Sequence, residues 1–101
     1  MDIINLTPHV VVLNDGTTFP PSGTVARVST TYSDEDGIFI KVGFGEVEEL
    51  PPEQPDTMYI VSGMVASATD RKDVVSPATG HPKCVRNEKG QIMSVPYLIR
   101  K

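Results

Sequence analysis

Residues 57–69 read TMYIVSGMVASAT, and this stretch decides the fold class. Its first five residues are apolar or β-branched, which is typical of a short strand. Ser62 then has the side chain of a helix N-cap, and apolar residues follow it at helical spacing. The stretch therefore predicts a strand over residues 57–61 that leads directly into a two-turn helix over residues 62–69.

Turn signals divide the rest of the chain into short apolar runs. Tight turns are predicted at residues 14–16 (Asn-Asp-Gly), 20–23 (Pro-Pro-Ser-Gly) and 87–90 (Asn-Glu-Lys-Gly), because these residue types tolerate turn backbones. Residues 51–56 (PPEQPD) are predicted to form a stiff connector, since proline keeps its neighbours extended.

A further strand is predicted over residues 24–29. Residues 31–36 are polar and read as a hairpin tip or loop, and residues 37–50 hold one or two strands. Gly43 and Gly45 mark a bulge or bend within them. In total the sequence predicts six or seven short antiparallel strands and one short helix, a β-rich α+β domain.

Length and composition favour one small domain over residues 1–101. A mass of 11.0 kDa leaves room for one core and excludes barrel enzymes and dinucleotide folds with a substrate domain. The chain has no tryptophan and only 6% aromatic residues, so its core should be aliphatic. Such a small core is marginal alone, which favours a homo-oligomer.

The charge is divided unevenly along the chain. Residues 1–56 carry two bases against ten acids, a net charge of −8, and residues 57–101 carry seven bases against three acids, a net charge of +4. A chain that is acidic as a whole binds long nucleic acid poorly. A small anionic ligand is still compatible with it, because such a ligand needs only a few local basic groups.

The sequence also indicates where the protein works. Cys84 is the single cysteine, so no internal disulfide can form and a reducing compartment is expected. Asp2 occupies the place of the basic start of a signal peptide, and no apolar run approaches the length of a membrane span. We therefore expect a cytoplasmic protein without a membrane partner.

Residue types for catalysis or metal binding are scarce. His9, His81 and Cys84 are too few for a closed metal site, and no spacing joins them as a nucleophile and its base. Residues 43–45 read Gly-Phe-Gly, without the third glycine or the lysine of a phosphate loop. The sequence predicts a protein that is not an enzyme and has no cofactor and no metal.

Arg27 is the first candidate for binding an anion. It is the only base between Asp2 and Lys41, and strand alternation places it on the side of Val25 and Ser29. A guanidinium there needs an anionic partner. The partner is either a small ligand or one of the many acids in the same segment.

Two further arginines, Arg71 and Arg86, could bind the same anion as Arg27. Asp70, Arg71 and Asp73 follow the predicted helix, and Arg86 lies on the C-terminal hairpin. The first group reads either as a solvated helix end or as a pocket rim that holds ribose or phosphate. Three arginines on three separate elements could meet around one small anion.

Several motifs together resemble those of a family of small phage and prophage proteins, that of the first-described Thoeris anti-defence protein. The similarity covers nearly the whole chain in order, through residues 5–9 (NLTPH), 20–23 (PPSG), 25–28 (VARV), 45–47 (GEV), 50–51 (LP), 59–62 (YIVS), Arg71 and Asp73. The resemblance implies a non-catalytic sponge that binds, without cleaving it, a cyclic ADP-ribose isomer made by bacterial immune TIR enzymes. It also implies an oligomer, up to a hexamer, and binding of cyclic oligonucleotides.

The resemblance carries ligand contacts over to matching positions only. These positions are Arg27, Tyr59, Asp70, Arg71, Asp73 and Arg86, with Tyr59 stacking on adenine. Without the resemblance, Tyr59 reads as a core residue with a hydrogen-bonded hydroxyl. Two other functions stay open: a phage structural or assembly protein without a nucleotide ligand, and a small cyclic-nucleotide hydrolase.

Overall fold

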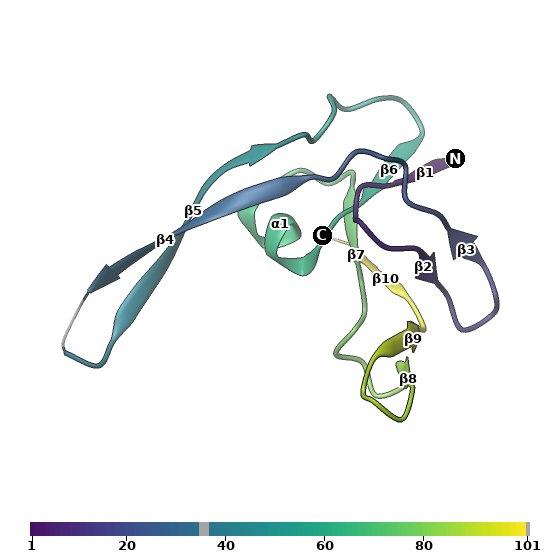
Figure 1. The fold of residues 1–101 in the computed structure, drawn as a ribbon. Coiled ribbons are helices and arrows are strands. Elements are labelled where there is room, and N and C mark those ends of the chain that lie inside the picture. The colour runs from purple at the N-terminus through teal and green to yellow at the C-terminus, as the bar shows by residue number, and fades with distance from the viewer. Residues whose placement is uncertain (35–36, 101) are drawn as a thin grey trace.

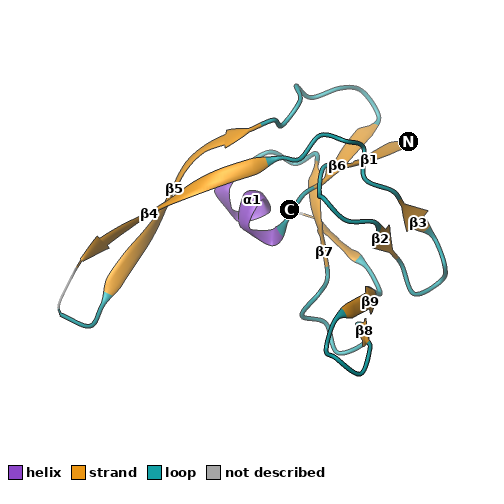
Figure 2. Cartoon of the chain, in the orientation of Figure 1, coloured by secondary structure: helices purple, strands orange, loops and turns teal. Residues whose placement is uncertain are grey.

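A computed structural model describes residues 1–34 and 37–100 of the chain. The described residues form ten short strands and one helix (Figures 1 and 2). In chain order these elements are β1 (Asp2–Asn5), β2 (Val11–Val12), β3 (Thr18–Phe19), β4 (Arg27–Asp34), β5 (Ile40–Glu48), β6 (Thr57–Ile60), α1 (Gly63–Ala68), β7 (Val74–Pro77), β8 (Val85–Arg86), β9 (Ile92–Ser94) and β10 (Leu98–Arg100).

The centre of the molecule is a four-stranded sheet in the order β1-β6-β7-β10. Strand β6 pairs in parallel with β1 and with β7, whereas β10 pairs with β7 antiparallel. Helix α1 connects the parallel strands β6 and β7, because parallel neighbours need a crossover of about a dozen residues. The hydroxyl of Ser62 accepts a hydrogen bond from the Val65 amide at 3.3 Å and caps this helix.

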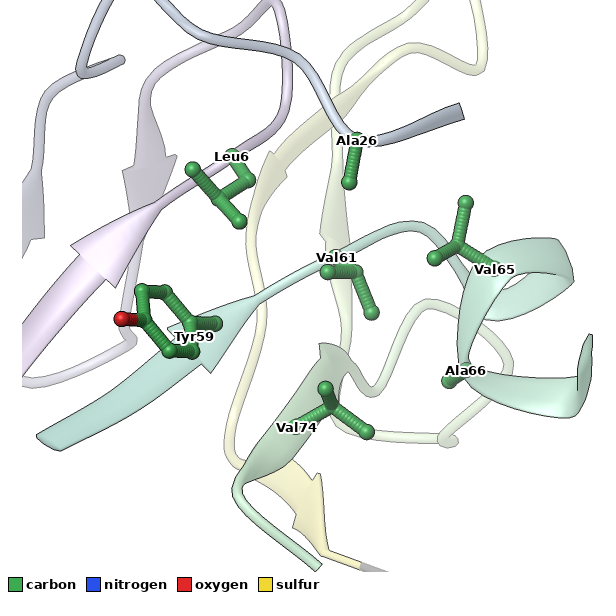
Figure 3. Close-up of a cluster of buried hydrophobic side chains, with 7 residues drawn as sticks. All are labelled: Leu6, Ala26, Tyr59, Val61, Val65, Ala66 and Val74. Atoms are coloured by element: carbon green, nitrogen blue, oxygen red, sulfur yellow. The ribbon is translucent and has the colours of Figure 1, made fainter. Parts of the chain in front are cut away.

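Strand alternation divides the core between the two faces of the sheet. On one face, side chains from β6, β7 and α1 form a cluster with residues that follow β1 and precede β4. Figure 3 shows this cluster, which consists of Leu6, Ala26, Tyr59, Val61, Val65, Ala66 and Val74. On the other face, Ile60 and Val75 pack against Val11 and Val95. The hairpin β2–β3 contributes to this second cluster, as do Cys84 and Val95, which flank the hairpin β8–β9, so side chains pack on both faces of the sheet.

A buried amide fixes the path of the chain after β1. Asn5 is 2% exposed, and its Nδ2 donates to the carbonyls of His9 at 2.8 Å and Phe19 at 2.9 Å. Its Oδ1 accepts from the amide and the hydroxyl of Thr7 at 2.9 and 2.7 Å. The backbone carbonyls of Asn5 and Leu6 accept from the amides of Ser22 and Ala26, which brings the start of β4 onto the sheet.

Strands β4 and β5 form a long two-stranded hairpin, here called the arm, that projects from the rest of the molecule (Figure 1). The radius of gyration is 15.1 Å, against about 13 Å for a compact chain of this length. Between Val28 and Thr30 the register shifts, so that Gly45 and Glu46 together oppose Ser29. A Cβ at Gly45 would meet Ser29 Oγ, so any other residue at this bulge would require the Ser29 side chain to move.

The β-rich domain with one short helix is confirmed, as are the helix, the bulge at Gly45 and the hairpin turns at residues 14–16 and 87–90. The strands are more numerous than predicted. Exclusively antiparallel pairing is wrong, because β1, β6 and β7 are parallel. The prediction missed β7, a run of apolar and small residues directly after a charged cluster, and also β10 at residues 98–100.

The boundaries around the arm also differ from the prediction. Strand β4 begins at Arg27 rather than at residue 24, because its partner β5 ends at Glu48, which lies opposite Arg27. Residues 31–34 pair with β5 and are not a tip. Residues 35 and 36 of the predicted tip lie outside the described residues.

We expect Asn5→Ala to lower the free energy of unfolding by about 3 kcal/mol, because it leaves buried donors and acceptors without partners. Urea unfolding followed by circular dichroism measures the change. Asn14→Ala is the matched control: Asn14 also bonds a carbonyl, that of Lys83 at 2.9 Å, but it is exposed and water can replace the bond. Equal losses in the two variants would contradict a special role of burial.

Candidate functional site

The candidate ligand pocket lies at the root of the arm. A cavity of about 250 Å³ is lined by Gly23, Thr24, Val25, Arg27 and Glu49. Two separate segments form it: the loop that leads into β4 and the residue that follows β5. Only Val25 among the five is partly buried, so the pocket is open to solvent.

Arg27 lines this pocket, and its guanidinium forms no ion pair with another described residue. Its neighbours Ala26 and Val28 pack into the core, so alternation directs Arg27 to the other side, as predicted. Within the described part of the chain, no carboxylate lies within 4 Å of its guanidinium, although Glu48 stands opposite it in the register. Two partners were considered for Arg27, a small ligand and an acid of the same segment. Among the described residues, the salt bridge to an acid is not formed.

Glu49 is the pocket residue that sequence analysis missed. Its φ is 62°, in the left-handed region that side chains other than Gly, Asn and Asp rarely adopt. Such a conformation costs on the order of 1–3 kcal/mol, and residues of this kind gather at functional sites. In the sequence, Glu49 is one of several neighbouring acids, and nothing in that run distinguishes it.

Arg71 and Asp73 form a partly buried ion pair, here called the clamp. The Arg71 Nε donates to Asp73 Oδ1 at 2.9 Å, and its Nη2 donates to Oδ2 in the bidentate geometry of a strong ion pair. Nη1 donates to the Pro51 carbonyl at 2.7 Å, and Glu53 Oε1 lies 3.7 Å from Nε. The hydrogen bond to Asp73 raises the pKa of Arg71 above its ordinary value. The guanidinium thus ties the connector between β5 and β6 to the start of β7.

Tyr59 belongs to the same cluster and to the core. The side chain is 1% exposed, and its hydroxyl donates to the Pro52 carbonyl at 3.3 Å. The Arg71 guanidinium carbon lies 5.9 Å from the ring centroid, within cation–π range. No ring face is open for stacking on adenine, so the structure has the alternative arrangement, a core tyrosine with a hydrogen-bonded hydroxyl.

The three arginines do not converge. Arg71 is tied at the start of β7, whereas Arg86 donates to the carbonyls of Thr79, just past the end of β7, and of Gly90. Arg86 is exposed and stabilises its own hairpin. Asp70 is exposed beside the clamp. Of the six predicted ligand residues, Tyr59, Arg71 and Asp73 are brought together, and Arg27 alone lines the pocket.

The remaining candidates have local partners. His81 Nδ1 accepts from the Lys83 amide at 3.0 Å, and its ring packs edge-on against Tyr97 at 5.5 Å. Cys84 is a half-buried neighbour of the second core cluster. Across residues 1–34 and 37–100, no group of three His, Cys, Asp or Glu side chains would hold a metal ion.

The helix content bears on the membrane question. The described part of the chain has one helix, of six residues, and none with the length and apolarity needed to cross a membrane.

Comparison with known proteins yields no relative: no family model, curated protein or solved structure matches the chain.

The clamp generates a stability prediction. Arg71→Ala should lower the free energy of unfolding by about 2 kcal/mol without any ligand, because Asp73 and the Pro51 carbonyl lose their charged donor. Urea unfolding measures the change, and Arg100→Ala, which removes an exposed arginine of β10, should lie within about 0.5 kcal/mol of the wild type. If Arg71→Ala unfolds like the wild type, the clamp does not stabilise the fold.

Proposed function

We propose that this protein is a non-catalytic binding protein that sequesters a small cyclic nucleotide signal, such as a cyclic ADP-ribose isomer, and thereby counteracts anti-phage defence. It works as a homo-oligomer in the cytoplasm of the host cell. Cyclic oligonucleotides are further ligands of the same chemistry. The observation that carries the proposal is Arg27, a guanidinium without an ionic partner in the described chain that lines a pocket together with a carboxylate.

The two charged groups of the pocket suit the two polar parts of a nucleotide. The planar fork of Arg27 matches the oxygens of a phosphate. The Glu49 carboxylate accepts hydrogen bonds, as acidic residues do from ribose hydroxyls in nucleotide sites. Arg27 and Glu49 line the same cavity without a direct ion pair, so each can bind a different group of one ligand.

The size of the pocket supports binding between subunits. A volume of about 250 Å³ lies below the usual range of about 300–1,000 Å³ for ligand pockets. Since the pocket is open, a second subunit can supply the missing wall and enclose the ligand. Enclosure would give the tight binding that sequestration of a scarce signal requires.

Arg27→Ala tests the site. If the guanidinium holds a phosphate, affinity for a cyclic ADP-ribose isomer should fall by about 2–5 kcal/mol, which is about 30-fold to 4,000-fold. Arg27→Lys should recover only part of it, because a point charge replaces the fork. Isothermal titration calorimetry measures the affinity.

The control for this test is Arg100→Ala, which removes an exposed arginine of β10 and should bind like the wild type. Thermal melts of the Arg27 variants should match the wild type, since Arg27 has no ion pair to lose in the described chain. Full affinity in a folded Arg27→Ala protein would show that this pocket is not the ligand site.

If the protein binds its ligand without catalysis, the ligand should be recovered unchanged. Heat denaturation of the complex after long incubation should release the ligand with its ring intact, and mass spectrometry identifies the released species. A linear or ring-opened product that forms at a rate proportional to protein concentration would establish the hydrolase instead.

A second candidate function has its own supporting observation. The projecting arm exposes large apolar side chains, as a phage structural or assembly protein would for its interactions. Native mass spectrometry of protein purified from signal-producing cells separates the two functions. An oligomer with bound nucleotide supports sequestration, and an oligomer without it supports the assembly role.

A further inference from the structure

From Thr30 to Tyr32 on β4 and from Val42 to Phe44 on β5, the arm has one apolar and one polar face, and at its outer end Ile40 pairs with Asp34. The register pairs Thr30 with Phe44 and Tyr32 with Val42, and partners directly across a sheet share one face. Ile40 lies on the same side of β5 by alternation. We call these five side chains the apolar face; the opposite face carries Thr31, Ser33, Lys41 and Gly43.

The apolar face continues the core out into solvent. At the root of the arm, Val28 and Val47 lie on this side and pack against the first core cluster. Farther out the same row is exposed: Tyr32 is 67% and Val42 53% exposed. Phe44 lies between these two zones and is 44% exposed. No described segment covers the outer row.

The exposed area is large for so small a protein. With Ile38 and Phe39 beyond the paired strands, the arm exposes on the order of 500 Å² of apolar side-chain surface. Apolar patches of this size mark binding surfaces, and a stable interface buries about 800 Å² on each partner. An isolated two-stranded hairpin is also only marginally stable in water, so the arm needs a cover.

We propose that the cover is a second copy of this chain, whose arm packs its own apolar face against the first about a two-fold axis. The two faces are identical, so one contact about this axis covers both of them and closes the dimer. Together with Ile38 and Phe39 at the end of the arm, which lie outside the paired face, the exposed area on one arm is more than half of the roughly 800 Å² that each partner buries in a stable dimer. This inference rests on the homo-oligomer of the proposed function and not on its ligand.

Sedimentation equilibrium at micromolar concentration tests the surface. Wild-type protein should have a mass of twice 11.0 kDa or a larger even multiple. Tyr32→Lys should weaken the association at least tenfold. Met93→Lys is the matched control, because Met93 is 56% exposed in a separate apolar region on β9 and should leave the mass unchanged.

Cross-linking decides the geometry even if Tyr32→Lys folds poorly. In a Cys84→Ser background, Tyr32→Cys lies on the apolar face and should form a disulfide-linked dimer under mild oxidation. Its neighbour Ser33→Cys lies on the opposite face and should stay monomeric on a non-reducing gel.

Three results would overturn the proposal. A monomer at all concentrations would refute both it and the proposed oligomer. An oligomer broken by Met93→Lys and not by Tyr32→Lys would refute the arm interface alone. Equal cross-linking through Tyr32→Cys and Ser33→Cys would do the same, and none of these results depends on nucleotide binding, which the Arg27 titrations measure separately.

Discussion

The buried amide of Asn5 is the interaction on which the arrangement depends. It leaves none of its hydrogen-bonding groups unpaired, and it joins the turn after β1 to the end of β3. A buried amide without these partners would be strongly unfavourable, so the chain has one low-energy path at this point. That path sets Leu6 against Ala26 and thereby places the root of the arm on the sheet. The Arg27 pocket and the direction of the arm both follow from it.

Local signals predicted the local structure. The Asn-Asp-Gly and Asn-Glu-Lys-Gly turns, the Ser62 cap and the alternation around Arg27 each depend on residues within a few positions of one another. The physical reason is that turn backbones, caps and strand alternation are set by side chains next to the backbone they act on. The fold class could therefore be predicted from short windows.

The errors arose where contacts join distant parts of the chain. Parallel pairing of β6 with β7 needs the α1 crossover, and the short run after Asp73 gave too weak a signal for a strand. Arg71 donates a hydrogen bond to the carbonyl of Pro51, which lies 20 residues earlier in the chain, and no periodic pattern in the sequence indicates this contact. A charged cluster that reads as a ligand rim is therefore a clamp, because the connector folds back onto it. The free charge of Arg27 could be suspected from its isolation, but the absence of a salt bridge among the described residues is a tertiary property.

The pocket and the arm meet at the root of the arm, where neighbouring residues contribute to both. Arg27 and Glu48 lie opposite each other at the root, while Val28 and Val47 beside them anchor the apolar face in the core. If a second copy covers that face, the arm is held in one orientation, and Arg27 is held at a fixed position relative to Glu49. A ligand that meets a fixed fork and a fixed carboxylate loses less affinity to ordering the site than one that must immobilise a free hairpin. Assembly through the apolar face would thus strengthen binding at a pocket that it does not itself line.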